Sequence, residues 1–379
     1  MLSPSPLSLF CALLLCFPLA ILFTITCPAA KPITAAGDGA TSGHNNDTPV
    51  SVFRRPETIR SPPPPPQPIP GDDESLLLVA SRVNPRPTSP RKLAFMFLTT
   101  APLWLAPLWE VYFNGSNQDL YNIYVHADPS FEYEPPFSGV FYGRGIPSKP
   151  SVRFTSTLIS AARRLLAHAL LHDPGNYMFA ILSPSCIPIH SFDFTYKTLM
   201  KSKKSFIEIL QNEPGTYDRW AARGQDAMLP VVRLEDFRIG SQFWVLTRRH
   251  ARLVVDDEKV WDRFNQPCTR EDTCYPEEHY FPTLLHMRDP RGSVSATLTH
   301  VDWSVSTGGH PREYRPSEVG AELISKLRSD RPRYGDDGSN GSDSSVRERR
   351  HHPFLFARKF SRASLKRLLR IANDIILKD

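Results

Sequence analysis

Three largely apolar runs mark the middle of this 379-residue chain, at 92–98, 121–126 and 177–182. Runs of this kind, without polar alternation, are typical of strands that are buried on both faces of a sheet. Between the second and third runs, apolar residues recur at helical spacing over 157–171, behind Ser156 as a helix cap. Strands that alternate with helices predict an α/β fold with a mostly parallel sheet covered by helices.

Polar residues follow each predicted strand. Thr99 and Thr100 come after the first strand, Asp128 after the second and Ser183 after the third. Ligands of open parallel sheets bind beyond the carboxyl ends of the strands. We therefore expect these side chains to lie around a pocket.

The sequence of the amino-terminal part predicts a membrane anchor followed by a stem. Residues 7–27 are almost wholly apolar, and no charged residue precedes Lys31. A bilayer span needs about 20 apolar residues, whereas a cleaved secretory signal has a core of about 7–15. We expect a cytoplasmic tail at 1–6 and a transmembrane signal-anchor at 7–27, and cleavage stays open as the alternative.

Residues 28–90 are rich in Pro, Gly, Ser and Asp, and their polyproline run at 61–70 predicts an extended spacer. We expect a disordered stem over 28–90, with one short helical turn at 76–80. The remaining residues, 91–379, are enough for a large core and form the expected luminal domain. Three Asn-x-Ser/Thr sequons, at Asn46, Asn114 and Asn340, agree with a luminal body.

The formal net charge is +6, and much of the excess lies after residue 347. A basic surface can contact nucleic acid, membrane phosphates or a nucleotide diphosphate. Luminal placement excludes nucleic acid as a partner. The alternative is a solvated terminal helix, because apolar residues recur at helical spacing over 365–376.

The segment 274–283 carries the candidate chemistry. Glu277, Glu278 and His279 lie in what we interpret as an aromatic, proline-punctuated loop, six positions after Cys268. Apolar neighbours raise the pKa of a carboxylate, so that it can take a proton from a hydroxyl near neutral pH. The alternative is a solvated acidic loop pinned by a Cys268–Cys274 disulfide, which the oxidising lumen favours.

The sequence gives little support for other kinds of catalytic or nucleotide-binding site. Ser183, Ser185 and Cys186 lie near His190, but no G-x-S-x-G elbow accompanies them, so a nucleophilic hydrolase is a poor match. P-loop and dinucleotide-binding fingerprints are also absent from the sequence.

Seven short motifs, in this order, are shared with one known family. They are Tyr121-Asn-Ile-Tyr-Val-His-Ala-Asp-Pro129, Arg163-Arg-Leu-Leu-Ala-His-Ala-Leu170, Leu182-Ser-Pro-Ser-Cys-Ile-Pro188, Gly240-Ser-Gln-Phe-Trp244, Glu278-His-Tyr-Phe-Pro-Thr283, Val301-Asp-Trp-Ser304 and Phe354-Leu-Phe-Ala-Arg-Lys-Phe360. The chain resembles the plant branch of the Core-2/I-branching β-1,6-N-acetylglucosaminyltransferases over residues 91–360. The resemblance implies a single-pass type II Golgi membrane protein with a GT-A-like fold. It also implies inverting transfer of a sugar from a UDP donor to a glycan or proteoglycan acceptor of the plant cell wall.

The resemblance also assigns roles to single residues. Glu278 matches the catalytic general base. The remaining matches are the supporting acid Glu277, the donor-side residues Asp128, Lys359 and Arg315, and the acceptor-side residues Trp303 and Arg219. Thr99, by its place at a strand end, is a further donor-side candidate.

Neither a metal nor a cofactor is expected. Metal-dependent transferases of this fold hold their metal with an Asp-x-Asp cluster, and no strict Asp-x-Asp occurs here. Asp256-Asp-Glu258 comes closest, but it follows a predicted helix at 248–255 and reads as a solvated cap. Cationic side chains are therefore expected to neutralise the departing UDP.

Two departures from the family pattern bear on activity. Ala162 stands where an acidic residue is expected before Arg163, and the segment 152–156 lacks an expected tryptophan. The resemblance implies transfer of N-acetylglucosamine in a β-1,6 linkage, and the departures keep glucuronic acid open as the alternative donor sugar. The alternative function is a catalytically silent, membrane-anchored glycan-binding or scaffold protein of the same fold.

Overall fold

The computed structural model of the chain describes residues 70–132, 139–306, 309–337 and 351–379. The expected anchor at 7–27 and the sequons Asn46 and Asn340 lie outside these ranges. Asn114 is described, and it is exposed at the end of a helix. Within the described ranges, no helix has both the length and the apolar character of a membrane span.

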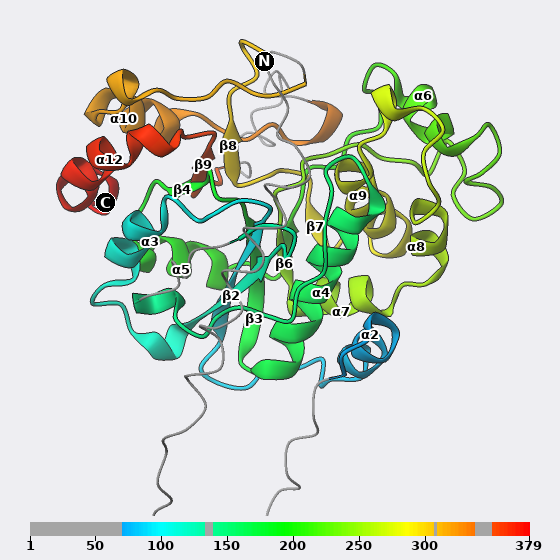
Figure 1. Cartoon of the computed structure of the whole chain (residues 1–379), viewed down its shortest axis with the longest axis horizontal. Helices are drawn as coiled ribbons and strands as arrows, with labels where there is room; N and C mark the ends of the chain where they lie inside the picture. Colours follow the sequence, from blue (N-terminus) through cyan, green and yellow to red (C-terminus); the bar gives the residue numbers. More distant parts are fainter. Residues whose placement is uncertain (1–69, 133–138, 307–308, 338–350) are drawn as a thin grey trace, which may run out of the picture. The chain divides into compact units, whose positions relative to one another are not determined.

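A six-stranded sheet forms the centre of the fold (Figure 1). Its strands, in spatial order, are β2 (Tyr121–Ala127), β1 (Lys92–Thr99), β3 (Asn176–Leu182), β6 (Val245–Thr247), β5 (Ser205–Phe206) and β7 (Ser293–Val294). Only β6 runs antiparallel to its neighbours. This arrangement confirms the predicted α/β class with a mostly parallel sheet, which fits a GT-A-like fold.

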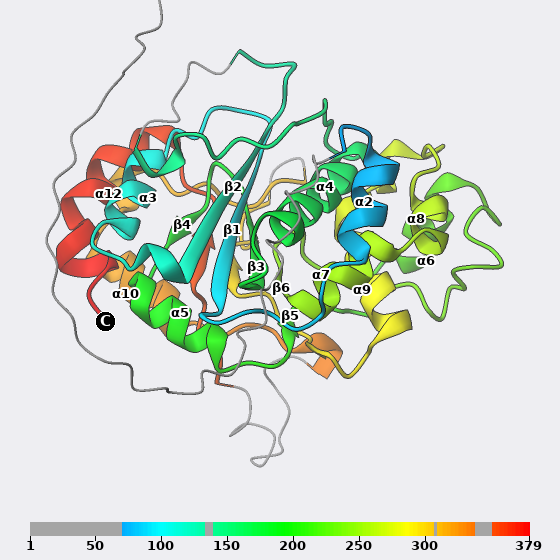
Figure 2. The same ribbon diagram turned by 90° about the horizontal axis from the view of Figure 1, so that it is seen from below.

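Helices cover both faces of this sheet, as Figures 1 and 2 show. One face carries α3 (Ala106–Phe113) and α5 (Phe192–Met200), and the other carries α4 (Ser156–His172), α7 (Arg248–Asp256) and α9 (Pro276–Arg288). Helix α4 is capped by Thr155, whose hydroxyl accepts the N–H of Thr157, one residue before the predicted cap. The other α-helices of the described residues are α2 (Asp73–Ser81), α6 (Thr216–Trp220), α8 (Lys259–Phe264), α10 (Ala321–Ser329) and α12 (Leu365–Ile371).

The described residues also form short 3₁₀ and π segments. They are η1 (Gln118–Leu120), η2 (Gly139–Phe141), η3 (Ala221–Arg223), η4 (Glu271–Thr273), η5 (Pro316–Glu318), η6 (Gly335–Asp337), η7 (Arg362–Ser364) and the π-helix η8 (Ala372–Ile376).

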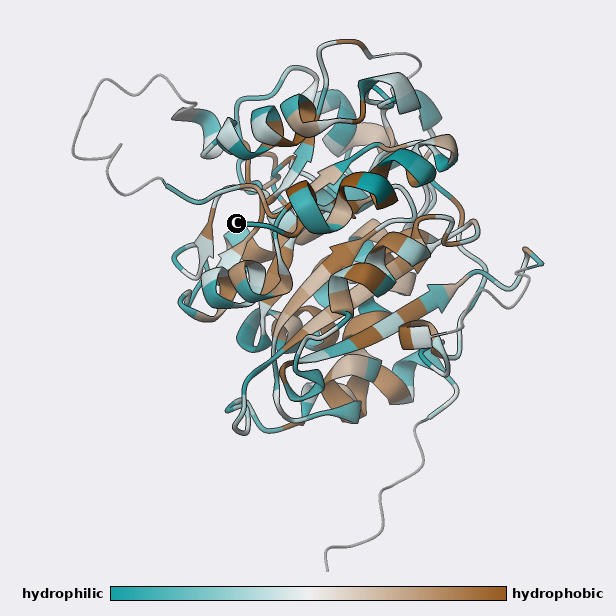
Figure 3. Cartoon of the chain, turned by 90° about the vertical axis from the view of Figure 1, so that its left-hand side faces the viewer, coloured by the Kyte–Doolittle hydropathy of each residue, from teal (hydrophilic) through white to brown (hydrophobic). Residues whose placement is uncertain are grey.

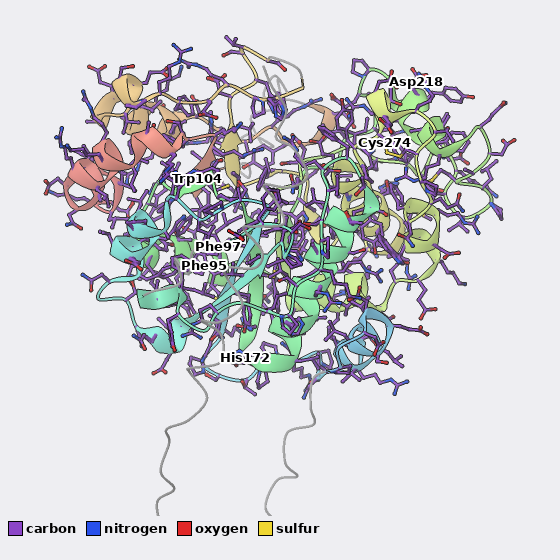
Figure 4. The ribbon with its side chains drawn as sticks, viewed as in Figure 1. Phe95, Phe97, Trp104, His172, Asp218 and Cys274 are labelled. Carbon is purple, nitrogen blue, oxygen red and sulfur yellow. A yellow bond between two sulfur atoms is a disulfide. The ribbon has the colours of Figure 1, made fainter. Side chains whose placement is uncertain are left out.

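The core on the α3 face is built from aromatic side chains of β1. Phe95 and Phe97, labelled in Figure 4, are fully buried. The ring of Phe95 lies 5.0 Å from that of Phe113, and the ring of Phe97 lies 5.2 Å from that of Trp109, both edge to face. Because burial of one such side chain stabilises a fold by about 1.5–3 kcal/mol, this cluster holds α3 firmly on the sheet.

The folded body begins before residue 91. In place of the short turn expected at 76–80, α2 is a nine-residue helix that packs against α4 and α7. Asp72 caps it by accepting the N–H of Ser75 at 2.8 Å, and Leu76 and Ala80 are fully buried. The part of the expected stem from α2 onward is therefore joined to the domain by apolar packing.

A second sheet lies beyond the carboxyl end of β3 (Figure 1). It contains β4 (Ile187–Pro188), β9 (Phe356–Arg358) and β8 (Thr299–Val301), with β9 in the middle. Strand β9 runs parallel to β8 and pairs Arg358 with Val301. This sheet brings the carboxyl-terminal part of the chain to the edge of the main sheet where the functional cavity lies.

Candidate active site

A cavity of about 660 Å³ opens at one edge of the main sheet. Glu208 lies just after β5, Thr297 just after β7 and Phe243 just before the antiparallel β6, and all three line the cavity. The cavity thus lies beyond the carboxyl ends of β5 and β7, as expected for an open parallel sheet. It is larger than two other cavities of the described residues, which measure about 230 and 490 Å³, and it is rich in charged side chains.

Four of the predicted site residues line this cavity. They are Glu277, Glu278, Arg219 and Trp303. The first two come from α9, Arg219 from α6, and Trp303 from the loop after β8. Side chains far apart in the sequence therefore meet around one space.

The segment that carries Glu277 and Glu278 is a helix, so its interpretation as a loop was wrong. Pro276 occupies the first helical position of α9, where its fixed φ favours a helix and its missing N–H costs nothing. Pro282 lies inside the same helix and cannot donate to the carbonyl of Glu278, four residues earlier. That carbonyl instead accepts the backbone N–H of Gly240 at 2.9 Å.

This hydrogen bond fixes the backbone of Glu278 to the segment before β6. Gly240 allows the contact because it has no side chain. A Cβ atom there would lie 3.0 Å from the carbonyl carbon of Glu208, closer still to the carbonyl oxygen, and 3.3 Å from Cγ of Pro282. The position of Glu278 thus depends on a proline that frees its carbonyl and on a glycine that can reach it.

A disulfide lies just before the start of α9. Cys268 is bonded to Cys274, and Cys274, labelled in Figure 4, is buried. The next residue, Tyr275, stacks edge to face on Phe154 at 5.2 Å, so an aromatic ring is present in the segment where a tryptophan was expected. Cys186 is buried as a free thiol.

Glu278 presents its carboxylate to the cavity in a setting suited to proton transfer. The residue is half-buried, and within the described ranges its carboxylate makes no hydrogen bond or ion pair. Burial raises its pKa, and the charges of Arg219 and Arg358 oppose this rise. A carboxylate that is available to solvent, with a raised pKa, can accept a proton from a hydroxyl group.

Glu277 has a different environment. Its side chain is buried, and burial raises its pKa to about 7, with the charge of Glu278 adding to the rise and the N–H of Phe154 opposing it. Its Oε2 has no hydrogen-bond partner among the described residues. Two adjacent carboxylates therefore differ in access, and Glu278 is the more accessible.

Arg358 is a site residue that the sequence reasoning missed. It lines the cavity, its guanidinium carbon lies 4.5 Å from the ring centre of Phe243, and its Nε has no partner within the described residues. Burial lowers its pKa, and the charge of Glu278 opposes that shift. Its pairing with Val301, which also lines the cavity, places both residues on one face of the second sheet.

The two cations predicted for the donor lie outside the cavity lining. Nζ of Lys359 is 3.2 Å from a carboxylate oxygen of Glu313. Arg315 is exposed at the start of η5, where its backbone N–H donates to Glu318 at 2.8 Å. Their proposed contacts with the donor stay predictions.

Thr99 and Asp128 lie at the ends of β1 and β2, and they also do not line the cavity. The hydroxyl of Thr99 donates to the carbonyl of His126 at 3.0 Å. The carboxylate of Asp128 accepts the backbone N–H groups of Ser130 at 2.8 Å and Ser151 at 2.7 Å. These bonds give both residues a structural role, and their predicted role toward a donor is untested.

Glu208 is a second site residue that the sequence reasoning did not identify. Its pKa is raised to about 7 by burial, and the charge of Arg333 opposes this. Arg333 itself pairs with Glu213 at 2.8 Å, and both residues line the cavity. The carboxylate of Glu208 has no hydrogen-bond partner in the described part of the chain.

Trp303 also lines the cavity and is 54% exposed, so its indole is available to a ligand there. Arg219 lies against Tyr275, with its guanidinium carbon 5.3 Å from the ring centre, and its Nη1 is 3.3 Å from Nε2 of His279. A flat apolar ring beside a fixed cation can bind a sugar face and its hydroxyl groups.

The described residues contain no group of three or more His, Cys, Asp or Glu side chains that could hold a metal ion. The acidic segment at 256–258 has a structural function. Asp256 and Glu258 are exposed, as expected, but Asp257, the C-cap residue of α7, is buried and accepts the N–H groups of Val260 and Trp261, at 3.2 and 2.8 Å, at the start of α8.

Comparison with known proteins identifies the family. Residues 93–328 match the Core-2/I-Branching enzyme family. The chain is 32% identical over 323 residues to Glycosyltransferase BC10 of rice, Oryza sativa subsp. japonica, a match that covers 75% of this chain and 77% of the relative. Given these matches and a charged cavity at the expected sheet edge, the chain belongs to the Core-2/I-branching family and is a glycosyltransferase.

Proposed function

We propose that this glycosyltransferase inverts the anomeric centre of a UDP-sugar and uses Glu278 as its general base. One observation carries this proposal. The carboxylate of Glu278 faces the cavity without a hydrogen bond from the described residues, and Arg219 and Arg358 are close enough to influence its pKa. These are the properties required to remove a proton from an acceptor hydroxyl.

The reaction is a single displacement. The acceptor hydroxyl transfers its proton to Glu278 while its oxygen forms a bond to the anomeric carbon. The bond from that carbon to the diphosphate oxygen breaks, and UDP leaves with the electron pair. Because attack comes from the face opposite the leaving group, the anomeric configuration inverts.

Charge develops on the departing diphosphate, and we assign its stabilisation to arginine. Arg358 and Arg153 both line the cavity, and the charge of each acts on Glu278. Fixed cations stabilise a developing anion most effectively where water is partly excluded. In this proposal the arginines make a metal unnecessary, and no other cofactor is required.

The acceptor lies on the side of Trp303, Arg219 and Glu208. The indole of Trp303 packs on a sugar face, and Glu208 accepts hydrogen bonds from sugar hydroxyls. The family resemblance favours N-acetylglucosamine as the transferred sugar and a β-1,6 linkage, with glucuronic acid as the second donor to test. Ala162, the residue that departs from the family pattern, packs in the core on α4 and does not line the cavity.

We further propose that the protein is a single-pass protein of the Golgi membrane with its catalytic domain in the lumen. The apolar segment at 7–27 and the Cys268–Cys274 disulfide support this location, because disulfides persist in oxidising compartments.

The test measures UDP release by the full chain from a panel of UDP-sugars, with and without EDTA. NMR of the product then determines its anomeric configuration. Turnover that resists EDTA and gives the inverted anomer would support the proposal. Retention of configuration or loss of activity in EDTA would contradict it, and UDP binding without turnover would favour the catalytically silent binding protein.

A further inference from the structure

The carboxyl-terminal helix presents a basic face to solvent. Arg362, at the start of η7, and Lys366, Arg367 and Arg370 on α12 are all exposed. None of them forms an ion pair within the described part of the chain. Figure 3 views this side of the molecule, and much of the ribbon near the carboxyl terminus there is hydrophilic.

The opposite face of this helix is fixed to the domain. Leu368 is fully buried in an apolar cluster, and α12 packs against α3. The end of the chain is also held, because Arg328 donates to the carbonyls of Ile375, Ile376 and Lys378 at 2.8–3.1 Å. The side chain of Asp379 accepts the N–H of Ser191 at 3.0 Å. The basic face is thus displayed by a rigid element.

The basic face is connected to the cavity through the chain and through hydrogen bonds. Arg358 lines the cavity, and Lys359 follows it. The backbone of Tyr314 donates to the carbonyl of Lys359 at 2.8 Å, and its carbonyl accepts the hydroxyl of Ser364 at 3.1 Å. Arg315, the residue after Tyr314, therefore lies beside the start of the basic helix.

The exposed cations of η7 and α12 follow Arg358, which lines the cavity, along the chain. We call Arg362, Lys366, Arg367 and Arg370 the cationic track. Glu313 neutralises Lys359, whereas Lys366 and Arg370, four residues apart on one helix face, repel each other. Like charges at this spacing destabilise a helix by a few tenths of a kcal/mol, and a bound polyanion would relieve the repulsion.

We propose that the cationic track binds the extended part of an anionic glycan acceptor, whose reacting sugar lies in the cavity. The inference rests on the proposed function and adds a substrate class, a glycan that carries carboxylates. Arginine binds carboxylates in bidentate geometry, and a row of cations attracts a polyanion from a distance. Because the track belongs to the segment that follows Arg358 out of the cavity lining, we favour a substrate over an anionic membrane surface.

The test is direct binding by the full chain at low and at physiological ionic strength. The probes are a sized oligogalacturonide, its fully methyl-esterified and uncharged counterpart, and vesicles that contain phosphatidylserine. One variant combines Lys366→Gln, Arg367→Gln and Arg370→Gln. Its matched control combines Lys201→Gln, Lys203→Gln and Lys204→Gln, which remove three equally exposed charges from the loop after α5.

We expect the oligogalacturonide to bind more tightly than its ester, with an affinity that falls as salt increases. The track variant should bind it about tenfold more weakly, because three weak surface ion pairs are lost together, while the control variant keeps its affinity. Equal binding of both oligosaccharides, equal losses in both variants, or binding only to vesicles would overturn the inference. Glu278→Gln should lose sugar transfer but retain oligogalacturonide binding. The proposal that Glu278 is the general base and the proposal that the cationic track binds the acceptor can therefore fail separately.

Discussion

Gly240→Ala tests how the backbone of Glu278 is held. The added Cβ would lie 3.0 Å from the carbonyl carbon of Glu208, closer still to its oxygen, and 3.3 Å from Cγ of Pro282. Since the nearest atoms belong to backbone and to a proline ring, the segments that carry Glu208 and Gly240 and helix α9 must separate by roughly 1 Å to remove the overlap. The hydrogen bond from Gly240 to the carbonyl of Glu278 would lengthen, and the carboxylate would move with its helix.

A displacement of about 1 Å at a catalytic group costs on the order of 10²-fold in rate, and overpacking costs about 1–3 kcal/mol of stability. The assay compares kcat, KM and the thermal unfolding midpoint of Gly240→Ala with those of wild type. Gly145→Ala is the matched control, because a Cβ there meets nothing within 4 Å. A folded Gly240→Ala protein with wild-type kcat would refute the reasoning.

Three further changes probe other parts of the site. Arg358→Gln removes a cation that lowers the pKa of Glu278. The acid limb of the pH profile of kcat/KM should therefore move to higher pH. An acid limb that stays in place or moves to lower pH would contradict the assignment of Glu278 as the general base. Trp303→Ala should raise the acceptor KM roughly tenfold without changing the unfolding midpoint, since this side chain is 54% exposed; acceptor saturation curves and thermal unfolding measure both. Replacing Cys268 and Cys274 with Ser opens a short loop and should cost about 2 kcal/mol in guanidinium unfolding, and unchanged stability would show that the disulfide is dispensable.

The central strands could be predicted because they are buried on both faces. Largely apolar runs identified β1, β2 and β3, and the helical spacing over 157–171 identified α4. Helix α9 gave no such signal. Nearly all of its residues are buried, so it lacks a polar face, and Pro282 inside it resembles a helix breaker.

The site was predictable where one local motif carried the chemistry, as for Glu278. It was not predictable where long-range pairing selects a side chain. Arg358 and Lys359 are adjacent cations, and only the pairing of β9 with β8 decides that Arg358 faces the cavity. Glu208 follows β5, a two-residue strand too short to be recognised from hydrophobic pattern.

The central claim is that Glu278 takes the proton of the acceptor hydroxyl. The most direct test is the kcat of sugar transfer by Glu278→Gln, measured beside wild type and beside Glu74→Gln, an exposed glutamate on α2 that serves as control. A lost general base predicts a fall in kcat of about 10²–10⁴-fold, with unchanged affinity for UDP and an unchanged unfolding midpoint. A Glu278→Gln enzyme that transfers sugar within a fewfold of the wild-type rate would contradict the account.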